Sequence, residues 1–187
     1  MPLSDDQFAP LAATLGADAR ATVRRLAVAD AARLVPLNDS AYPAVPITSV
    51  EAMASLLAVA DLAVAIEREG SIVGFVVTLG DGADYDSENY QFFSARGVDS
   101  RYIDRIVIAD SERGTGLGAA LYRLVFAVAR AEGRAEVTCE VNLDPPNPGS
   151  LAFHERLGFA SVGTQATKGG AVTVTLLAAP VAPAPAS

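Results

Sequence analysis

The sequence has few of the residues that form metal sites and covalent cross-links. Its 187 residues include one cysteine, Cys139, one histidine, His154, and no tryptophan. A single cysteine cannot close an internal disulfide, and together with one histidine it does not supply the ligands of a zinc site. We therefore expect no metal, and we expect Cys139 to be an inert packing residue. Apolar residues make up 51% of the chain, enough for a core without such cross-links.

Basic residues are scarce as well. The 14 lysines and arginines are outnumbered by 22 aspartates and glutamates, which gives a formal net charge of −8. Because binding to a nucleic-acid backbone requires a basic face, we expect no nucleic-acid partner, whereas a cationic small molecule or a basic peptide is compatible with this charge. No apolar run reaches membrane-spanning length and the N-terminus has no leader pattern, so we expect a cytoplasmic protein without membrane contact.

What the sequence does contain is a regular succession of strand-like and helix-like segments. We expect one domain over residues 21–178, after a loosely ordered lead-in at 1–20 and before an Ala/Pro-rich tail at 179–187. Alternating apolar residues predict strands at 21–29, 62–67, 72–79, 102–109, 136–142, 162–166 and 172–177. Helical spacing predicts helices whose N-caps are Asp30, Ser49, Ser87 and Asn147, and a further helix after a glycine-rich turn.

Glycines concentrate in that turn. A β-branched strand leads into Arg-Gly-Thr-Gly-Leu-Gly at 113–118, and the turn opens a helix with an apolar stripe. Glycine lets the backbone approach a ligand closely and adopt left-handed angles. The helix start offers unpaired N–H groups and the positive end of its dipole, and Arg113 adds a planar, permanently charged group suited to phosphate oxygens. The stretch therefore predicts a site for a phosphate-bearing cofactor.

The turn alone does not decide which cofactor it binds. Residues 114–119 also match the loose dinucleotide pattern G-x-G-x-x-A, and Glu140 lies near the position of a ribose-binding acid. Against a dinucleotide site, four residues (110–113) separate the strand from the first glycine, and two helices and a hairpin precede the unit. A P-loop is excluded because no Gly-Lys-Ser/Thr follows. A turn that binds nothing stays open as an alternative.

A second motif lies downstream, where Asn147 and Ser150 begin a helix that ends in Leu-Gly-Phe at 157–159. With the motif at 113–118, in this order and at this separation, the chain resembles the GCN5-related N-acetyltransferase (GNAT) superfamily over residues 102–159. The family's pyrophosphate motif is Gln/Arg-x-x-Gly-x-Gly/Ala after a central strand. The resemblance implies an α/β (α+β) fold with a mixed, mostly antiparallel sheet flanked by helices, whose two central strands splay apart.

The resemblance also implies acetyl-CoA as acyl donor, inserted into the splay. Backbone groups of the central strand would lie beside the thioester, the glycine turn would hold the pyrophosphate, and the second motif would flank the cofactor arm. A neutral amine would attack the thioester directly, with the Ile108 N–H stabilising the oxyanion. The implied cofactor contacts are Ile106, Val107, Ile108, Arg113, Gly114, Thr115, Gly116, Leu117, Gly118, Asn147 and Ser150.

One position departs from the family pattern. Many members carry a tyrosine proton donor seven residues after the helix-capping Asn, and this chain has His154 there. His154 can donate an N–H as a neutral tautomer, or act as an acid if a nearby carboxylate raises its pKa. An alternative of equal weight is that His154 packs in the helix and that water supplies the proton.

The general base and the acceptor pocket are less defined. Alternation along the central strand places Asp104 on the same face as Tyr102, Ile106 and Ile108, where it can reach an amine. An ion pair with a neighbouring arginine is the more common role for such a residue. The acidic, aromatic segment at 81–93 reads mainly as a surface loop and a short helix. Three residues of this segment are weaker candidates for lining an acceptor pocket: Tyr85, Asn89 and Tyr90.

The sequence therefore predicts an N-acetyltransferase that moves an acetyl group from acetyl-CoA to a primary amine of a small molecule or peptide. The alternative from another class is a non-catalytic acyl-CoA-binding module, and a dinucleotide-dependent oxidoreductase comes third. An exposed edge strand or hairpin is compatible with a homodimer.

Overall fold

The computed structural model describes residues 8–9 and 21–182, so most of the predicted lead-in and the end of the predicted tail lie outside the described residues. The strands are β1 (Ala21–Arg25), β2 (Leu62–Arg68), β3 (Ser71–Leu79), β4 (Ser100–Ile108), β5 (Glu136–Asp144), β6 (Ala160–Thr167) and β7 (Val172–Pro180). The helices are α2 (Ala31–Ser40), α3 (Val50–Val59), α4 (Glu88–Ala95), α5 (Leu117–Ala131) and α6 (Pro148–Arg156). Short 3-10 turns are η1 (Val28–Asp30), η2 (Asp110–Glu112) and η3 (Lys168–Gly170).

These strands form one seven-stranded sheet in the order β1-β2-β3-β4-β5-β7-β6. All neighbours run antiparallel except β4 and β5, which are parallel. The β2–β3 hairpin turns at Glu69 and Gly70, whose φ angles of 50° and 78° are the left-handed values that a tight hairpin turn requires. The mixed, mostly antiparallel sheet expected from the sequence is confirmed.

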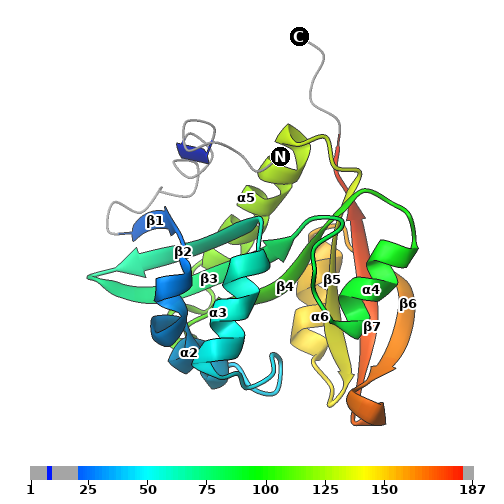
Figure 1. Ribbon diagram of the computed structural model, residues 1–187, viewed down its shortest axis with the longest axis horizontal. Coiled ribbons are helices and arrows are strands. Elements are labelled where there is room, and N and C mark those ends of the chain that lie inside the picture. The colour runs from blue at the N-terminus through cyan, green and yellow to red at the C-terminus, as the bar shows by residue number, and fades with distance from the viewer. Residues whose placement is uncertain (1–7, 10–20, 183–187) are drawn as a thin grey trace.

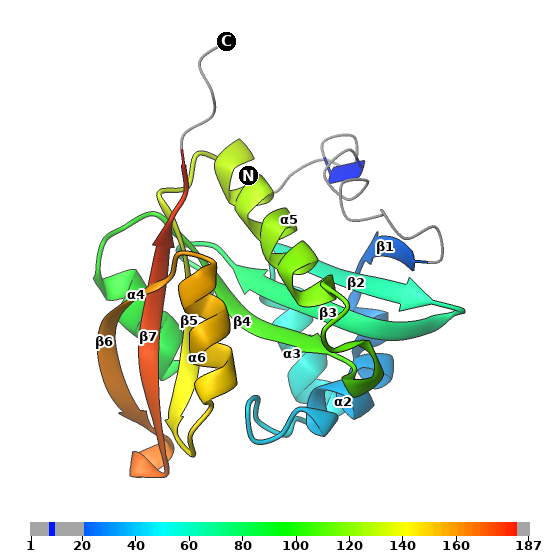
Figure 2. The ribbon, with the colours of Figure 1, turned by 180° about the vertical axis from the view of Figure 1, so that it is seen from behind.

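Helices cover both faces of the sheet (Figures 1 and 2). On one face, α5 buries Leu121 and Leu124 in a core that also includes side chains of β2, β4, β5 and β7. On the other face, Leu34 of α2, Met53 of α3 and Phe93 of α4 form the second core. The 3.6-residue spacing of apolar side chains in these helices explains why each presents one buried stripe.

The two central strands separate after a short contact. β4 and β5 pair only where Ser100–Tyr102 lies beside Glu136–Thr138, and β4 then continues to Ile108 without a partner on that side. β5 instead pairs with β7 along most of its length. Figure 1 shows the resulting divergence, and Figure 2 shows α6 beside it and α5 in front of the sheet. The splay implied by the resemblance is present.

An irregularity in β4 corrects the predicted side-chain alternation. Val77 of β3 pairs with Arg105 and the next residue, Thr78, pairs with Ile103, so Asp104 is an extra residue in a β-bulge. Tyr102 consequently belongs to one core, whereas Ile106 and Ile108 pack against the other. The expectation that a single face carries Tyr102, Asp104, Ile106 and Ile108 is therefore wrong.

The start of the domain also differs from the prediction. The first strand ends at Arg25 instead of continuing to 29, because the chain turns into η1. Asp30 does not cap α2 with its side chain. Its carboxylate accepts from the Ala27 N–H at 2.9 Å and pairs with Arg24 at 2.8 Å, and the Arg24 hydrogen bond lowers the pKa of Asp30 to about 2.

At the other end, the final strands are longer than predicted. β6 and β7 pair from Ala160 and Ala178 to Thr167 and Val172, and β7 continues to Pro180, so the sheet includes the first two residues of the predicted tail. Ser49, Ser87 and Asn147 cap their helices as expected. No helix in the described part of the chain has the length and apolarity needed to cross a membrane.

Candidate active site

The glycine turn forms an open backbone loop between β4 and α5. Gly114 and Gly116 have φ angles of 77° and 89°, and Gly116 is the N-cap of α5. These angles explain glycine at both positions, since a side chain there strains the backbone. A Cβ added at either position meets no atom within 4 Å, so the space beside the turn is open. N–H groups at the start of α5 have no intrahelical partner and suit an anion.

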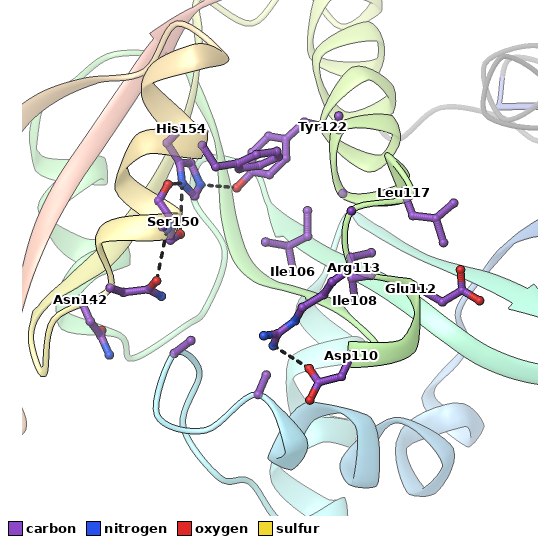
Figure 3. Close-up of a pocket in the computed structure, with 18 of the residues that line it drawn as sticks. Ile106, Ile108, Asp110, Glu112, Arg113, Leu117, Tyr122, Asn142, Ser150 and His154 are labelled. Carbon is purple, nitrogen blue, oxygen red and sulfur yellow. Dashed lines mark hydrogen bonds and ion pairs between the residues drawn. The ribbon is translucent and has the colours of Figure 1, made fainter.

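A cavity of about 1010 Å³ lies beside this turn, between the end of β4 and the start of α6 (Figure 3). Arg113 lines the cavity and pairs with Asp110 at 2.9 Å, with both side chains mostly exposed. This surface pair contributes little to stability, so Arg113 can exchange it for a ligand phosphate. The predicted site residues that line this cavity are Ile106, Ile108, Arg113, Gly114, Gly116, Leu117, Gly118, Asn147, Ser150 and His154.

The free edge of β4 presents backbone groups to the splay. The Ala109 N–H donates to Val73 of β3 at 2.9 Å, and Val107 pairs with Phe75 of the same strand. Because successive N–H groups of a strand point to opposite edges, those of Ile106 and Ile108 point away from β3, toward β5. Both N–H groups therefore face the gap.

The start of α6 forms the opposite wall of the cavity. The Asn147 side chain accepts from the Ser150 N–H at 3.2 Å, and Pro148 occupies the first helical turn, where its missing N–H is tolerated. His154 lies one turn further on, and only 5% of its surface is exposed. The cap thus fixes the helix that carries His154 into the cavity.

His154 and Tyr122 form a buried pair, which Figure 3 shows at the inner end of the cavity. The His154 Nδ1 lies 2.7 Å from the Ser150 carbonyl oxygen, which can only accept, so Nδ1 carries the proton. The Nε2 atom is then the acceptor of the Tyr122 hydroxyl at 2.5 Å. Tyr122 was not among the predicted site residues, although its place four residues after Gly118 puts it on the same helix face as that glycine.

Burial sets the protonation of both partners. It lowers the pKa of His154 below its ordinary 6.5, although the hydrogen bond to Ser150 partly opposes this. Burial also raises the pKa of Tyr122 well above 10. No carboxylate pairs with His154 in the described structure, so the condition under which His154 could act as an acid, a neighbouring carboxylate that raises its pKa, is not met. At neutral pH the pair is a neutral imidazole and a protonated phenol.

A second cavity of about 380 Å³ lies on the β5 side of the gap. Tyr85 and Asn89, two of the candidates for an acceptor pocket, line it together with Asp104, the candidate base. Asp104 accepts from the Tyr85 hydroxyl at 2.7 Å and from the Arg105 Nε at 3.0 Å, so both carboxylate oxygens are bonded. Asp104 therefore forms an ion pair with a neighbouring arginine, Arg105, which is the role that we expected to be more common for this residue.

The two cavities meet at the Tyr122–His154 pair. The residues that line both are Pro43, Ala44, Ile106, Tyr122, Asn142, Asn147, Ser150 and His154, which we call the junction. Molecules bound in the two cavities would therefore lie next to each other at the junction. The arrangement can bring two bound reactants together beside the free edge of β4.

Three predicted site residues lie elsewhere. Val107 is buried in the opposite core, and Thr115 is exposed and donates its hydroxyl to the Glu112 carbonyl at 2.6 Å. Tyr90 lines neither cavity, because its hydroxyl donates to the Gly80 carbonyl at 2.8 Å. Cys139 is buried as expected, and burial raises the pKa of its thiol well above 9. No cluster that could hold a metal exists among the described residues.

Comparison with known proteins identifies the class to which this fold and site belong. The model of the acetyltransferase (GNAT) family matches residues 27–159, well over half of the chain. The protein therefore belongs to the GNAT family of acetyltransferases. Among curated proteins, no sequence matches.

Solved structures share the fold at low sequence identity. The ribosomal-protein-S18-alanine N-acetyltransferase of Escherichia coli superposes with a TM-score of 0.66 at 19% identity, covering 88% of this chain and 96% of that one. Ard1 of Thermoplasma volcanium gives 0.70 at 16% identity, covering 87% and 99%. YncA of Salmonella typhimurium, solved with its cofactor acetyl-CoA, gives 0.63 at 18% identity, covering 89% and 97%. At these identities the likeness shows the fold.

Proposed function

We propose that this protein is an N-acetyltransferase that moves the acetyl group of acetyl-CoA to a primary amine of a small molecule or peptide. The observation that carries the proposal is the junction, where two cavities meet beside unpaired N–H groups of β4. Such a site suits direct transfer, because each cavity holds one reactant and the junction brings the reacting atoms together.

The larger cavity fits acetyl-CoA. Its open glycine turn and the N-terminus of α5 suit the pyrophosphate, and Arg113 can add a charged contact. The volume of about 1010 Å³ accommodates a cofactor of this size, and the cavity continues along β4 toward the junction. Asn147 and Ser150 flank that path, as the family resemblance implied.

The groups at the junction have distinct chemical capacities. The thioester supplies the acetyl group, and the Ile108 N–H is placed to stabilise negative charge on its carbonyl oxygen. The Tyr122 hydroxyl has one proton, which it donates to His154 Nε2 at rest; by rotating that proton into the cavity it can protonate the departing sulfur, while the neutral His154 holds the phenol ring and oxygen in position. In this proposal Tyr122 replaces the tyrosine that many family members carry at the position of His154. Asp104 is a weak candidate for the base that deprotonates the amine, because both of its carboxylate oxygens already accept hydrogen bonds.

Two measurements test the proposal. Acetyl-CoA and CoA, but not NAD, should raise the temperature of unfolding, since a ligand at about 100 times its dissociation constant adds roughly 2.7 kcal/mol to the native state. Thiol release from acetyl-CoA should then depend on an added primary amine. Stabilisation by acetyl-CoA without amine-dependent thiol release would favour the non-catalytic binding module, and stabilisation by NAD alone would favour the oxidoreductase.

Gly116→Ala is expected to weaken acetyl-CoA binding by about tenfold, which is about 1.4 kcal/mol. The alanine strains a backbone at φ 89° and places its Cβ in the open space beside the turn. Isothermal titration with acetyl-CoA measures the change. Gly97→Ala is the matched control, because Gly97 has a φ of 65°, open space around it and no place in either cavity. Equal losses of affinity in both variants would contradict the assignment of the turn.

A further inference from the structure

Glu140 of β5 has a carboxylate oxygen that no group in the described structure satisfies. Its Oε1 accepts from the Tyr102 hydroxyl at 3.1 Å, whereas Oε2 is fully buried and has no hydrogen-bond partner. A buried, unpaired carboxylate oxygen is costly, and native structures seldom retain one without a reason. Because Glu140 lines the smaller cavity, a ligand in that cavity can supply the missing partner.

The charged groups around Glu140 leave its own charge uncompensated. Burial is the main cause that raises its pKa to about 8, and the Asp104 carboxylate of β4 adds to the effect. The Tyr102 hydroxyl, the Asn89 side chain of α4 and the Arg105 charge lower the pKa but do not cancel the rise, and Asn89 forms no hydrogen bond with Oε2. Arg105 is already paired with Asp104. Without a ligand the group is therefore mainly the neutral acid at neutral pH, and a bound cation would favour its carboxylate form and pair with Oε2.

We propose that the smaller cavity binds the acceptor as a primary ammonium ion at Glu140 Oε2, and that Glu140 is the catalytic base that removes its proton. This inference rests on the proposed function and deepens it. Glu140 suits the role because it lines the smaller cavity together with Ile106, one of the residues of the junction onto which that cavity opens.

The proton and electron balance of the step is complete. One proton passes from the ammonium nitrogen to Oε2, and the freed lone pair forms the C–N bond to the acetyl carbon. The C–S bond breaks, sulfur keeps its electron pair, and the Tyr122 hydroxyl gives sulfur a proton. The nitrogen loses its second proton as the amide forms, which restores Tyr122. Glu140 releases its proton to solvent, so the products are an amide, a free thiol and one proton.

The remaining lining of the cavity indicates which amines fit. Four acids (Asp86, Glu88, Asp104 and Glu140) and two bases (Arg105 and Lys168) line it, and Arg105 is already paired with Asp104. The Asp86 and Glu88 side chains are exposed at the mouth, where they favour further positive charge. The acceptor class is therefore a cationic primary amine without a neighbouring carboxylate, such as an aliphatic diamine.

Glu140→Gln tests the assignment in the full-length protein. With an aliphatic diamine and saturating acetyl-CoA, we expect kcat/KM for the amine to fall by about tenfold or more at pH 7.5. The wild-type kcat/KM should rise with pH through about 8, and in the variant this rise should move to the pKa of the amine itself. The dissociation constant of acetyl-CoA should not change. Glu155→Gln, on the exposed side of α6 and outside both cavities, is the matched control.

The outcomes separate this inference from the proposed function. Absence of amine-dependent thiol release in the wild-type protein would overturn both. Release that Glu140→Gln leaves unchanged, with the same pH profile, would overturn only the role of Glu140. An ω-amino carboxylate that reacts better than the diamine of equal length would overturn the proposed acceptor class.

Thermal unfolding gives a readout that is independent of turnover. Because the folded protein binds a proton at Glu140 more tightly than the unfolded chain, native stability should fall as pH rises from about 4.5 through about 8. Glu140→Gln removes that loss, so the variant should melt several degrees higher than the wild type at pH 9 and not at pH 5. A variant that melts lower at pH 9 would show that the anion is satisfied within the fold, which would contradict the inference.

Discussion

Tyr122→Phe is expected to lower kcat by about 100-fold while the KM for acetyl-CoA stays nearly constant. Phenylalanine keeps the ring that packs against His154 and Phe159 but removes the hydroxyl proposed as proton donor to sulfur. Loss of a positioned acid typically lowers the rate by 10² or more, about 2.7 kcal/mol at the transition state. Steady-state kinetics with a saturating amine measures the effect, and a poorer leaving group should enlarge it.

Tyr90→Phe is the control for Tyr122→Phe. It removes the hydroxyl of another buried tyrosine, which bonds Gly80 and Ala83 and lies outside both cavities. We expect about 1 kcal/mol less stability and unchanged kcat. Full turnover of Tyr122→Phe would remove Tyr122 from the reaction and leave solvent as the source of the proton.

His154 should affect kcat less than Tyr122 does. Because burial lowers the pKa of His154 below 6.5, the pH dependence of the wild-type kcat should contain no step near pH 6.5 that is due to His154. The pH profile of His154→Phe should therefore have the same shape in that range. His154→Phe removes the acceptor that orients the Tyr122 hydroxyl, so a loss of only a few-fold is expected from this positioning role. If His154→Ala and His154→Phe both keep full turnover across pH, His154 has no part in the proton transfer.

The features that could be predicted from the sequence depend on local backbone chemistry. Gly114 and Gly116 adopt the left-handed angles that their identity permits, and Asn147 followed by Pro148 caps α6 as such a pair should. These signals located the turn and the helix start that line the large cavity. They need no knowledge of distant contacts, because a turn or a cap is determined within a few residues.

The features that escaped prediction depend on long-range packing. The bulge at Asp104 arises from the register of β4 against β3, and one extra residue reverses every later side chain. Tyr122 appears as one more residue of a core helix until α6 places His154 beside it. Glu140 lies on the polar side of an alternating strand, which gives no hint that the splay and α4 enclose it.

Arg101→Met is expected to destabilise the fold by roughly 3 kcal/mol, because removing one partner of a buried ion pair leaves the other charge unsatisfied. Arg101 is completely buried in the short segment where β4 and β5 pair, so it holds the closed end of the splay. It bonds Asp61 at 2.8 Å, Thr78 at 2.6 Å and Glu132 at the end of α5. Thermal unfolding should show a midpoint about 6 to 12 °C lower.

The loss of stability expected for Arg101→Met is at the lower end of the range for breaking a buried ion pair, because Arg134 also lies near the two carboxylates that Arg101 contacts. Its guanidinium lies 3.3 Å from Glu132 and 3.8 Å from Asp61. A double variant with Glu132→Gln should therefore lose less than the sum of the single changes, with a coupling of about 1 kcal/mol or more. Arg123→Met, on the exposed side of α5, is the matched control and should change stability by less than about 0.5 kcal/mol. An unchanged midpoint in Arg101→Met would show that apolar packing alone holds the closed end of the splay.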